Sequence, residues 1–311
     1  MAGLAQTTIS KINQVYNEWG AKIPAEVTPR NVLIFCVIAL LCIGSIMVAS
    51  ASMPYADRLH ENAFHYVIRH GISIFVAAVA AFLTYKISLN IWFNNTFPLW
   101  IMTILLLAVV LVVGSEVNGS TRWIRIAGFT LQASEVAKVM MAIFTADYVV
   151  RRAEEVRNNL SGLFRLGGVM VITVGLILAE PDLGATAVIV LMILGVFFLA
   201  GAPAIQFIAF LAFIILGLAA AIILEPYRLQ RALSFTDPWA DPLGTGYQLS
   251  NALMAFGRGE WAGVGLGHSI QKMSYLPEAH TDFMLAILGE EFGFFGISTV
   301  LILSFVMLVC C

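Results

Sequence analysis

The chain has 311 residues, of which 60% are hydrophobic and 12% are charged, and its mean hydropathy is +0.89. This composition excludes a water-soluble domain built around a single core and indicates an integral membrane protein. The formal net charge of −2 offers no overall attraction for a nucleic acid.

The polar tail, residues 1–30, precedes the first apolar run and carries Lys11, Lys22 and Arg30. It contains no short apolar core followed by a small-residue cleavage site, so no secretory signal peptide is predicted. The three basic residues predict a cytoplasmic N-terminus, and four arginines in "RRAEEVRNNLSGLFR" (151–165) fall on the same side if the spans alternate.

Apolar runs near the length needed to cross a bilayer follow one another through the chain. They predict an all-α polytopic membrane protein whose membrane domain, residues 31–311, has about eight transmembrane helices, at 31–51, 67–85, 98–114, 133–150, 166–180, 184–200, 204–224 and 285–311. The fifth and sixth runs are short and are split by "EPDLG". A helical hairpin that dips partly into the bilayer is therefore an alternative to two full spans.

With the N-terminus inside, the outward segments are 52–66, 115–132, 181–183 and 225–284. The last lies between the seventh and eighth spans and is too long for a simple connector. Within it, Asp237 and Asp241 each precede a proline, which favours extended backbone, and Gly244 and Gly246 permit a turn. The following "YQLSNALMAF" has helical spacing and predicts a half-buried helix, either re-entrant or interfacial.

Ionisable residues occur at the ends of the predicted spans and inside them. Glu135 and Lys138 lie one helical turn apart near the start of the fourth span, where such groups indicate function. A simple ion pair that stabilises the helix start is the alternative.

The segment "SYLPEAHTDFMLAILGEEFGFFG" (274–296) puts polar groups at the outer mouth of the last span and two carboxylates inside it; the groups are Glu278, His280, Thr281, Asp282, Glu290 and Glu291. Buried adjacent carboxylates need partners, for which Lys138 and the outer arginines are candidates. Thr281 or Asp282 acting only as a helix cap is the alternative for those two residues.

Two other patterns in the sequence do not predict a dinucleotide site or a metal site. "GVGLGHS" neither follows a predicted strand nor lies in a βαβ unit, so a dinucleotide site is not predicted. His60, His65 and His70 repeat every five residues and do not share a helical face, and the four cysteines lie in apolar helices without metal-type spacing. No metal site is therefore predicted from these residues.

Four separated motifs resemble, in order, those of the SEDS family of bacterial membrane glycosyltransferases, and within it the cell-division branch. They are "NGSTRWIRI" with "QASEVAK", "EPDLGAT", "DPWADPLGTGYQLSNALMAFGRGE" and "YLPEAHTDFMLAILGEEFG". The resemblance covers about residues 30–311. Members of the family have ten spans, so the resemblance implies that the last two are missing here and puts the activity of this chain in question.

The resemblance implies that the protein polymerises lipid II into peptidoglycan glycan strands. The 4-hydroxyl of one N-acetylglucosamine attacks the anomeric carbon of the growing strand, and undecaprenyl pyrophosphate leaves with inversion. Asp241 is implied as the essential carboxylate of an outward cavity, and we expect it to act as the base. Arg122, Trp123, Glu135 and Lys138 match family positions around the same cavity.

The leaving pyrophosphate requires cations. Arginine binds phosphate oxygens with two parallel hydrogen bonds, which makes Arg122, Arg125 and Arg258 candidates, with Lys138 as a point charge. A divalent cation (Mg or Mn) is an alternative that could share this task, although no carboxylate cluster in the sequence specifies one. Glu278, His280, Thr281 and Asp282 are expected to support the outer mouth of the site.

The resemblance also implies a location and partners. These are the bacterial inner membrane at the division septum, with the site facing outward, a cognate class b penicillin-binding transpeptidase and other division proteins. Two alternatives stay open. Intramembrane charges suit a flippase for the same lipid-linked precursor. The missing spans suit an inactive scaffold in the division complex.

Overall fold

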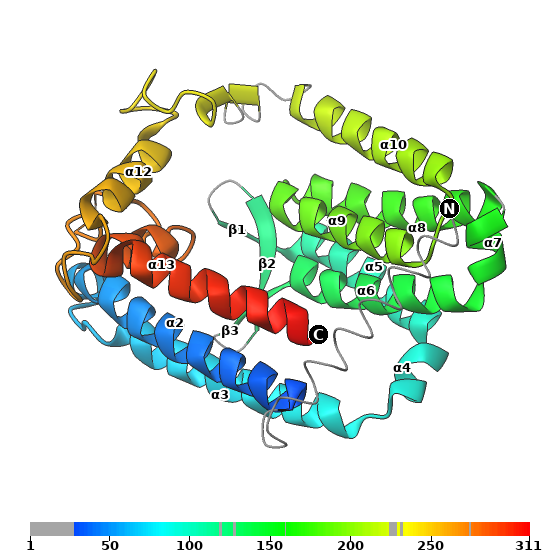
Figure 1. Ribbon diagram of the computed structural model, residues 1–311, viewed down its shortest axis with the longest axis horizontal. Helices are drawn as coiled ribbons and strands as arrows, with labels where there is room; N and C mark the ends of the chain where they lie inside the picture. The colour runs from blue at the N-terminus through cyan, green and yellow to red at the C-terminus, as the bar shows by residue number, and fades with distance from the viewer. Residues whose placement is uncertain are drawn as a thin grey trace, which may run out of the picture. The chain divides into compact units, whose positions relative to one another are not determined.

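The structure is a computed structural model that describes residues 28–117, 120–126, 129–158, 160–223, 229–230, 233–273 and 275–311. Figure 1 labels its elements. The helices are α2 (Pro29–His60), α3 (His65–Lys86), α4 (Leu89–Asn94), α5 (Thr96–Val113), α6 (Ala133–Arg151), α7 (Ala153–Asn158), α8 (Leu160–Ala179), α9 (Leu183–Leu199), α10 (Ala204–Ile223), α12 (Tyr247–Gly259) and α13 (Met284–Cys310), and the strands are β1 (Ser115–Val117), β2 (Ser120–Ile126) and β3 (Phe129–Gln132). Each predicted span coincides with a helix, which confirms the helical membrane fold.

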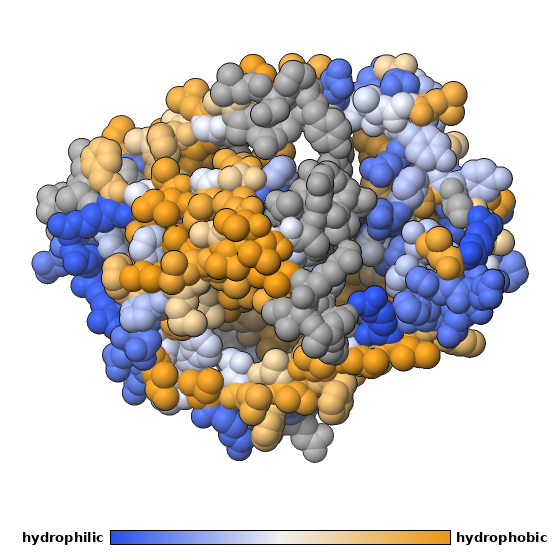
Figure 2. All heavy atoms as spheres, turned by 180° about the vertical axis from the view of Figure 1, so that it is seen from behind, coloured by the Kyte–Doolittle hydropathy of each residue, from blue (hydrophilic) through white to orange (hydrophobic). Residues whose placement is uncertain are grey.

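Length and hydropathy mark four of the described helices, α2, α3, α5 and α13, as able to cross a membrane. Three shorter apolar stretches lie in α8, α9 and α10. Large apolar side chains such as Phe75, Leu105 and Phe305 point outward and are 60–69% exposed. Figure 2 shows wide hydrophobic areas on the surface, as expected for a protein whose solvent is lipid.

The chain divides into two compact units. Unit 1 comprises Met1–Val79 and Gln230–Cys311, and unit 2 comprises Ala80–Leu229. The tail 1–27 lies outside the described residues, and so do 224–228, 231–232 and 274 in the long outer segment.

Unit 2 is a helical bundle with a small sheet at one end. Leu107, Met141, Ile177, Ile189 and Phe197 from α5, α6, α8 and α9 are fully buried in its core. The segment expected as a plain outer loop, 115–132, instead forms an antiparallel sheet in the order β1-β2-β3. Its strands connect the end of α5 to the start of α6.

Unit 1 packs α2 and α12 against α13. Met47 of α2, Ala255 of α12 and Ile287 of α13 are buried in one cluster. The face of α12 that packs consists of small residues, Ala252, Ala255 and Gly259, while Leu253 is 41% exposed. This confirms the predicted half-buried helix. Helix α2 continues to His60, nine residues past the predicted end of the first span, because Ser52 and Ala56 are buried there.

Helix α13 is broken at Gly293, whose φ of 63° lies in the left-handed region. The break frees backbone groups that residues 260–265 then satisfy. The amides of Val264 and Gly265 donate to the carbonyls of Glu290 and Glu291 at 3.0 and 2.9 Å, and the amide of Phe294 donates to the carbonyl of Glu260 at 2.9 Å. The loop after α12 is therefore joined to the broken helix by backbone hydrogen bonds.

Glycines make this close approach feasible. A Cβ at Gly263 would collide with the carbonyl group of Glu291, and φ at Gly263 is +79°. A Cβ at Gly293 would lie 2.5 Å from the Gly263 nitrogen. Both positions therefore require glycine for space and for backbone conformation.

We predict that Gly263→Ala destabilises the protein more than Gly267→Ala. Gly267 has a similar φ of +84° but nothing within 4 Å of a Cβ, so it reports backbone strain alone, of about 1–2 kcal/mol. Gly263→Ala adds an overpacking cost of about 1–3 kcal/mol. The thermal unfolding temperature in detergent measures both. Equal temperatures for the two variants would contradict the close packing.

Candidate functional site

Asp241 lies directly before Pro242, at the start of a tight turn that leads into α12. Its Oδ2 accepts the amide of Thr245 at 2.9 Å, and its carbonyl accepts the amide of Gly246 at 3.0 Å. A Cβ at Gly244 would strike the Asp241 carboxylate. The side chain is exposed, and within the described part of the chain its hydrogen bonds fall on Oδ2. Oδ1 is thus the oxygen that a substrate hydroxyl can approach.

Arg258, predicted as a phosphate-binding residue, lies at the end of α12 and pairs with Glu290. Its Nη1 donates to Glu290 Oε1 at 2.7 Å, while its side chain stays 42% exposed. The fully buried Glu290 carboxylate also accepts the Ser269 hydroxyl and the amides of Ile270, at 3.0 Å, and Gln271. Glu290 therefore fixes both the guanidinium and the loop 269–271.

Glu291, the next residue of α13, is bound by Lys272 and Ser50. Lys272 Nζ donates to Glu291 Oε1 at 2.6 Å and to Ser50 Oγ at 2.9 Å. Ser50 of α2 in turn donates to Glu291 Oε1 at 2.7 Å. Of the two candidate partners for this carboxylate pair, Lys138 or the outer arginines, Lys138 is not a partner, because it binds Glu135 and the two glutamates are satisfied within unit 1. Among the outer arginines, Arg258 was a correct candidate.

The residues predicted at the outer mouth form a local turn. The Thr281 hydroxyl donates to Glu278 Oε2 at 2.7 Å. His280 stacks on Tyr55 with ring centroids 5.0 Å apart, and burial lowers its pKa while the Glu278 carboxylate opposes that shift. The N-cap of α13 is Phe283 with no side-chain cap bond, so neither Thr281 nor the exposed Asp282 caps the helix.

In unit 2, Arg122 projects from β2 and clamps the break between α8 and α9. Its Nε donates to the carbonyl of Glu180 at 3.1 Å, a second nitrogen donates to the carbonyl of Pro181, and its Nη1 lies 4.0 Å from Asp182. Asp182 caps α9 by accepting the amide of Ala185 at 3.0 Å. Arg122 thus holds the segment that joins the two helices.

The remaining predicted residues of unit 2 lie in the sheet and at the start of α6. Lys138 Nζ lies 2.6 Å from Glu135 Oε1. This is the ion pair at the start of the helix that was the alternative to a functional role. Trp123 is half-buried and pairs with Gln132 across β2 and β3. Arg125 lies opposite Thr130, and its side chain lies outside the described part.

Glu180 is a residue that the sequence analysis did not single out. Its side chain is fully buried, and neither carboxylate oxygen has a hydrogen-bond partner in the described structure. Burial raises the pKa of Glu180 to about 7, the nearby Asp182 carboxylate adds to the rise, and the Arg122 guanidinium opposes it. The sequence signal that could have identified Glu180 is the pair of acidic residues in "EPDLG", which interrupts two apolar runs. A buried titratable group beside a charged pair marks a candidate functional position.

Within the described residues, no group of three or more His, Cys, Asp or Glu side chains lies together as a metal site would require.

The residues predicted for the site divide between the two units. Unit 1 supplies Asp241, Arg258 and the turn at Glu278–Asp282, and unit 2 supplies Arg122, Trp123, Arg125, Glu135 and Lys138. Lys272 is a further residue that the sequence analysis missed. It lies in an irregular loop, and no periodicity relates it to Glu291.

The chain is similar to known proteins along its whole length. A family model described as "Cell cycle protein", which groups FtsW, RodA and SpoVE, matches residues 30–311. A relative from Acinetobacter baylyi, "Probable peptidoglycan glycosyltransferase FtsW", is 72% identical over 100% of this chain and 78% of its own length. A relative of the same name from Shewanella sediminis is 45% identical over 89% of this chain and 68% of its own.

Two solved structures share the fold. One, described as "Structural coordination of polymerization and crosslinking by a peptidoglycan synthase complex", has a TM-score of 0.67 and 26% identity, covering 89% of this chain and 75% of that one. The other is the rod shape determining protein RodA of Thermus thermophilus, with a TM-score of 0.62 and 22% identity over 89% of this chain and 72% of that one. The second likeness concerns the fold alone.

The raised pKa of Glu180 predicts a pH-dependent stability. Between the ordinary carboxyl pKa of 4.5 and about 7, the folded state holds a proton that the unfolded state has lost. Stability is therefore highest below 4.5 and falls as the pH rises through 7. Glu180→Gln removes this loss, so the variant should unfold at a higher temperature than wild type at pH 8 and at the same temperature near pH 4.5. Parallel wild-type and variant profiles from pH 4.5 to 8.5 would contradict the assignment.

Proposed function

We propose, because the chain belongs to the FtsW, RodA and SpoVE family of cell cycle proteins, that it is a peptidoglycan glycosyltransferase that polymerises lipid II. The observation that carries the residue-level proposal is the Asp241 turn, which presents one exposed carboxylate with an unengaged oxygen. Glycosyl transfer with inversion needs one base beside the acceptor, since a single displacement occurs.

Asp241 acts as that base in our proposal. Its Oδ1 takes the proton of the acceptor 4-hydroxyl as the oxygen attacks the anomeric carbon. The bond from that carbon to undecaprenyl pyrophosphate breaks on the opposite face. The Thr245 amide at Oδ2 holds the carboxylate in one orientation, which removes the cost of ordering it during the reaction.

Arg258, which belongs to unit 1 like Asp241, is the proposed cation that binds the leaving pyrophosphate. Its pairing with buried Glu290 fixes one edge of the guanidinium, and the exposed remainder keeps further N–H donors. Arg122 is engaged by two backbone carbonyls, so we propose that it positions the segment 180–182. We also propose that Arg125 and Lys138 contact the phosphates of the leaving group. Trp123 and Glu135 are proposed to contact the substrate.

We further propose the division septum of the inner membrane as the location, with the Asp241 turn facing outward. The proposed partner is a class b penicillin-binding transpeptidase. The likeness to a synthase complex that couples polymerisation and crosslinking supports a partner of this kind.

We predict that Asp241→Asn lowers glycan-strand formation by about 10²–10⁴-fold, because the amide cannot accept the proton. Polymer is measured from fluorescent lipid II with the purified full chain and its cognate transpeptidase. Folded yield should match wild type, since the side chain is exposed.

Asp237→Asn is the matched control. Asp237 also precedes a proline, is exposed and accepts a nearby amide, that of Trp239 at 3.1 Å. We expect its activity to stay within a few-fold of wild type. Equal polymer from wild type and Asp241→Asn would overturn the role of Asp241 as base. Lipid II transport without polymer from the wild-type chain would favour the flippase alternative.

A further inference from the structure

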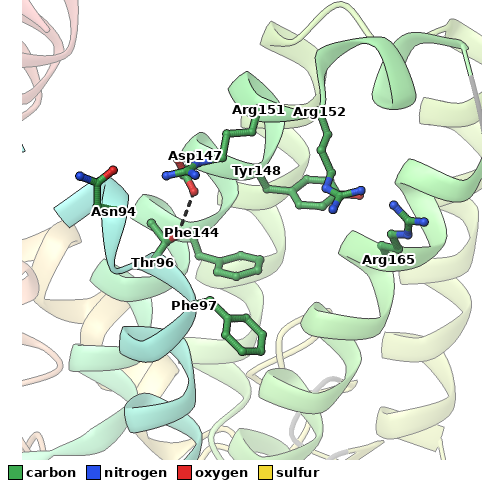
Figure 3. Close-up of a pocket in the computed structure, with 9 residues that line it drawn as sticks. All are labelled: Asn94, Thr96, Phe97, Phe144, Asp147, Tyr148, Arg151, Arg152 and Arg165. Atoms are coloured by element: carbon green, nitrogen blue, oxygen red, sulfur yellow. Dashed lines mark hydrogen bonds and ion pairs between the residues drawn. The ribbon is translucent and has the colours of Figure 1, made fainter. Parts of the chain in front are cut away.

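A second site of distinct chemistry lies wholly within unit 2. A cavity of about 340 Å³ lies between the start of α5, the end of α6 and the start of α8. Figure 3 shows the side chains that line it. The sheet β1–β3 and the break at 180–182 lie at the other ends of these helices. The cavity is therefore a helix length away from the unit 2 residues of the proposed catalytic site.

The cavity combines an aromatic wall with hydroxyl groups. Phe97, Phe144 and Tyr148 line it (Figure 3). The Tyr148 hydroxyl donates to the carbonyl of Gly162 at 2.9 Å, and the rings of Phe144 and Tyr148 lie roughly parallel. These contacts fix the wall in place, so the cavity does not depend on side chains that must first become ordered.

One arginine of the cavity, Arg151, is already bound by protein groups. Arg151 Nε donates to Asp147 Oδ1 at 2.6 Å, and Thr96 donates to Oδ2 of the same carboxylate at 2.8 Å. A second nitrogen of Arg151 donates to the carbonyl of Phe93. Asp147 is almost fully buried and neutralises this guanidinium.

The other two arginines share a single carboxylate. Arg152 Nη1 and Arg165 Nη1 donate to Glu155 at 2.9 and 2.8 Å. Two guanidinium groups on one carboxylate leave one positive charge in excess. Their side chains are 44% and 56% exposed, and in the described structure their remaining N–H groups bond to no protein acceptor. This pair offers donors for a further anion, and a guanidinium fork matches phosphate oxygens.

Exposed apolar side chains occur in the lining of the cavity and next to it in the sequence. Phe97, which lines the cavity, is 59% exposed, and Val150 and Phe164, which directly precede the lining residues Arg151 and Arg165, are 78% and 73% exposed. Such exposure places the arginines where hydrocarbon meets the headgroup layer. Because α5 and α6 run from here to the side of the proposed catalytic residues, the cavity faces the other leaflet, which is cytoplasmic in the proposed orientation.

We propose that this cavity binds the phosphate of an anionic phospholipid headgroup, held by Arg152 and Arg165 above the aromatic wall. A soluble phosphate ion presents the same anionic group to the two arginines as a phospholipid headgroup does. The exposed apolar rim favours the lipid, because a soluble ion gains nothing from Phe97 and Phe164.

The test uses the full chain in detergent micelles and dioctanoyl phosphatidylglycerol as the probe, with binding measured by thermophoresis. We expect saturable binding to wild type and binding of dioctanoyl phosphatidylcholine, which has no net charge, that is at least about tenfold weaker. Arg152→Ala/Arg165→Ala should weaken phosphatidylglycerol binding by about tenfold or more. Glu155→Gln should strengthen it, because both guanidinium groups lose their competing carboxylate.

Arg30→Ala/Lys86→Ala is the matched control, since it removes two exposed charges expected on the same membrane side but outside the cavity. Its affinity should stay within about twofold of wild type. Arg165→Lys guards against misfolding of the double variant, and it should bind more weakly than wild type because the fork is lost. Equal phosphatidylglycerol affinity in wild type, the double variant and Glu155→Gln would overturn the proposal. So would inorganic phosphate that displaces the lipid at equal concentration, because the ligand would then be a soluble anion.

Discussion

Two adjacent carboxylates, Glu290 and Glu291, are buried in an otherwise apolar helix, and the outer segment of unit 1 is organised around them. Removing two charges from water is costly, and only close cations with additional hydrogen bonds offset that cost. Arg258, Lys272, Ser269 and Ser50 supply these bonds. Because the donors come from α2, α12 and the loop after it, satisfying the two glutamates also fixes where those elements lie against α13. The broken helix at Gly293 adds backbone bonds to the same loop.

Two buried carboxylates at the break between α8 and α9 differ in how far their hydrogen bonds are satisfied. Asp182 is satisfied by the hydroxyl of Ser134, the amide group of Gln132 and the start of α9, so its role is to hold the break between α8 and α9. Glu180, two residues earlier, is equally buried but has no partner in the described structure. Burial raises the pKa of the Glu180 carboxyl to about 7, and groups with strongly shifted pKa values are concentrated at functional sites. Arg122 links the two by binding the backbone between them.

Hydropathy predicted the membrane helices closely, because a bilayer requires long apolar runs, and helical spacing predicted α12. Local patterns did not reveal the sheet at 115–132, whose first strand has only three residues. Local sequence patterns also did not predict which residues bind Glu291. Lys272 lies 19 residues away in an irregular loop, and a pairing of that kind depends on the break at Gly293 and on tertiary packing. The motifs named Asp241, but the turn that orients its carboxylate became visible only with the backbone.

The buried ion pairs of α13 hold the outer segment of unit 1 in place. A double-mutant cycle of Lys272→Met and Glu291→Met, measured as the free energy of unfolding in mixed micelles and as glycan-strand formation, tests this most directly. Each single change should cost about 3–5 kcal/mol of stability and abolish polymer formation, because it leaves one charge buried and unpaired. The double variant should recover most of the stability. Two losses that simply add in the double variant would contradict the claim, because the two groups would then act independently.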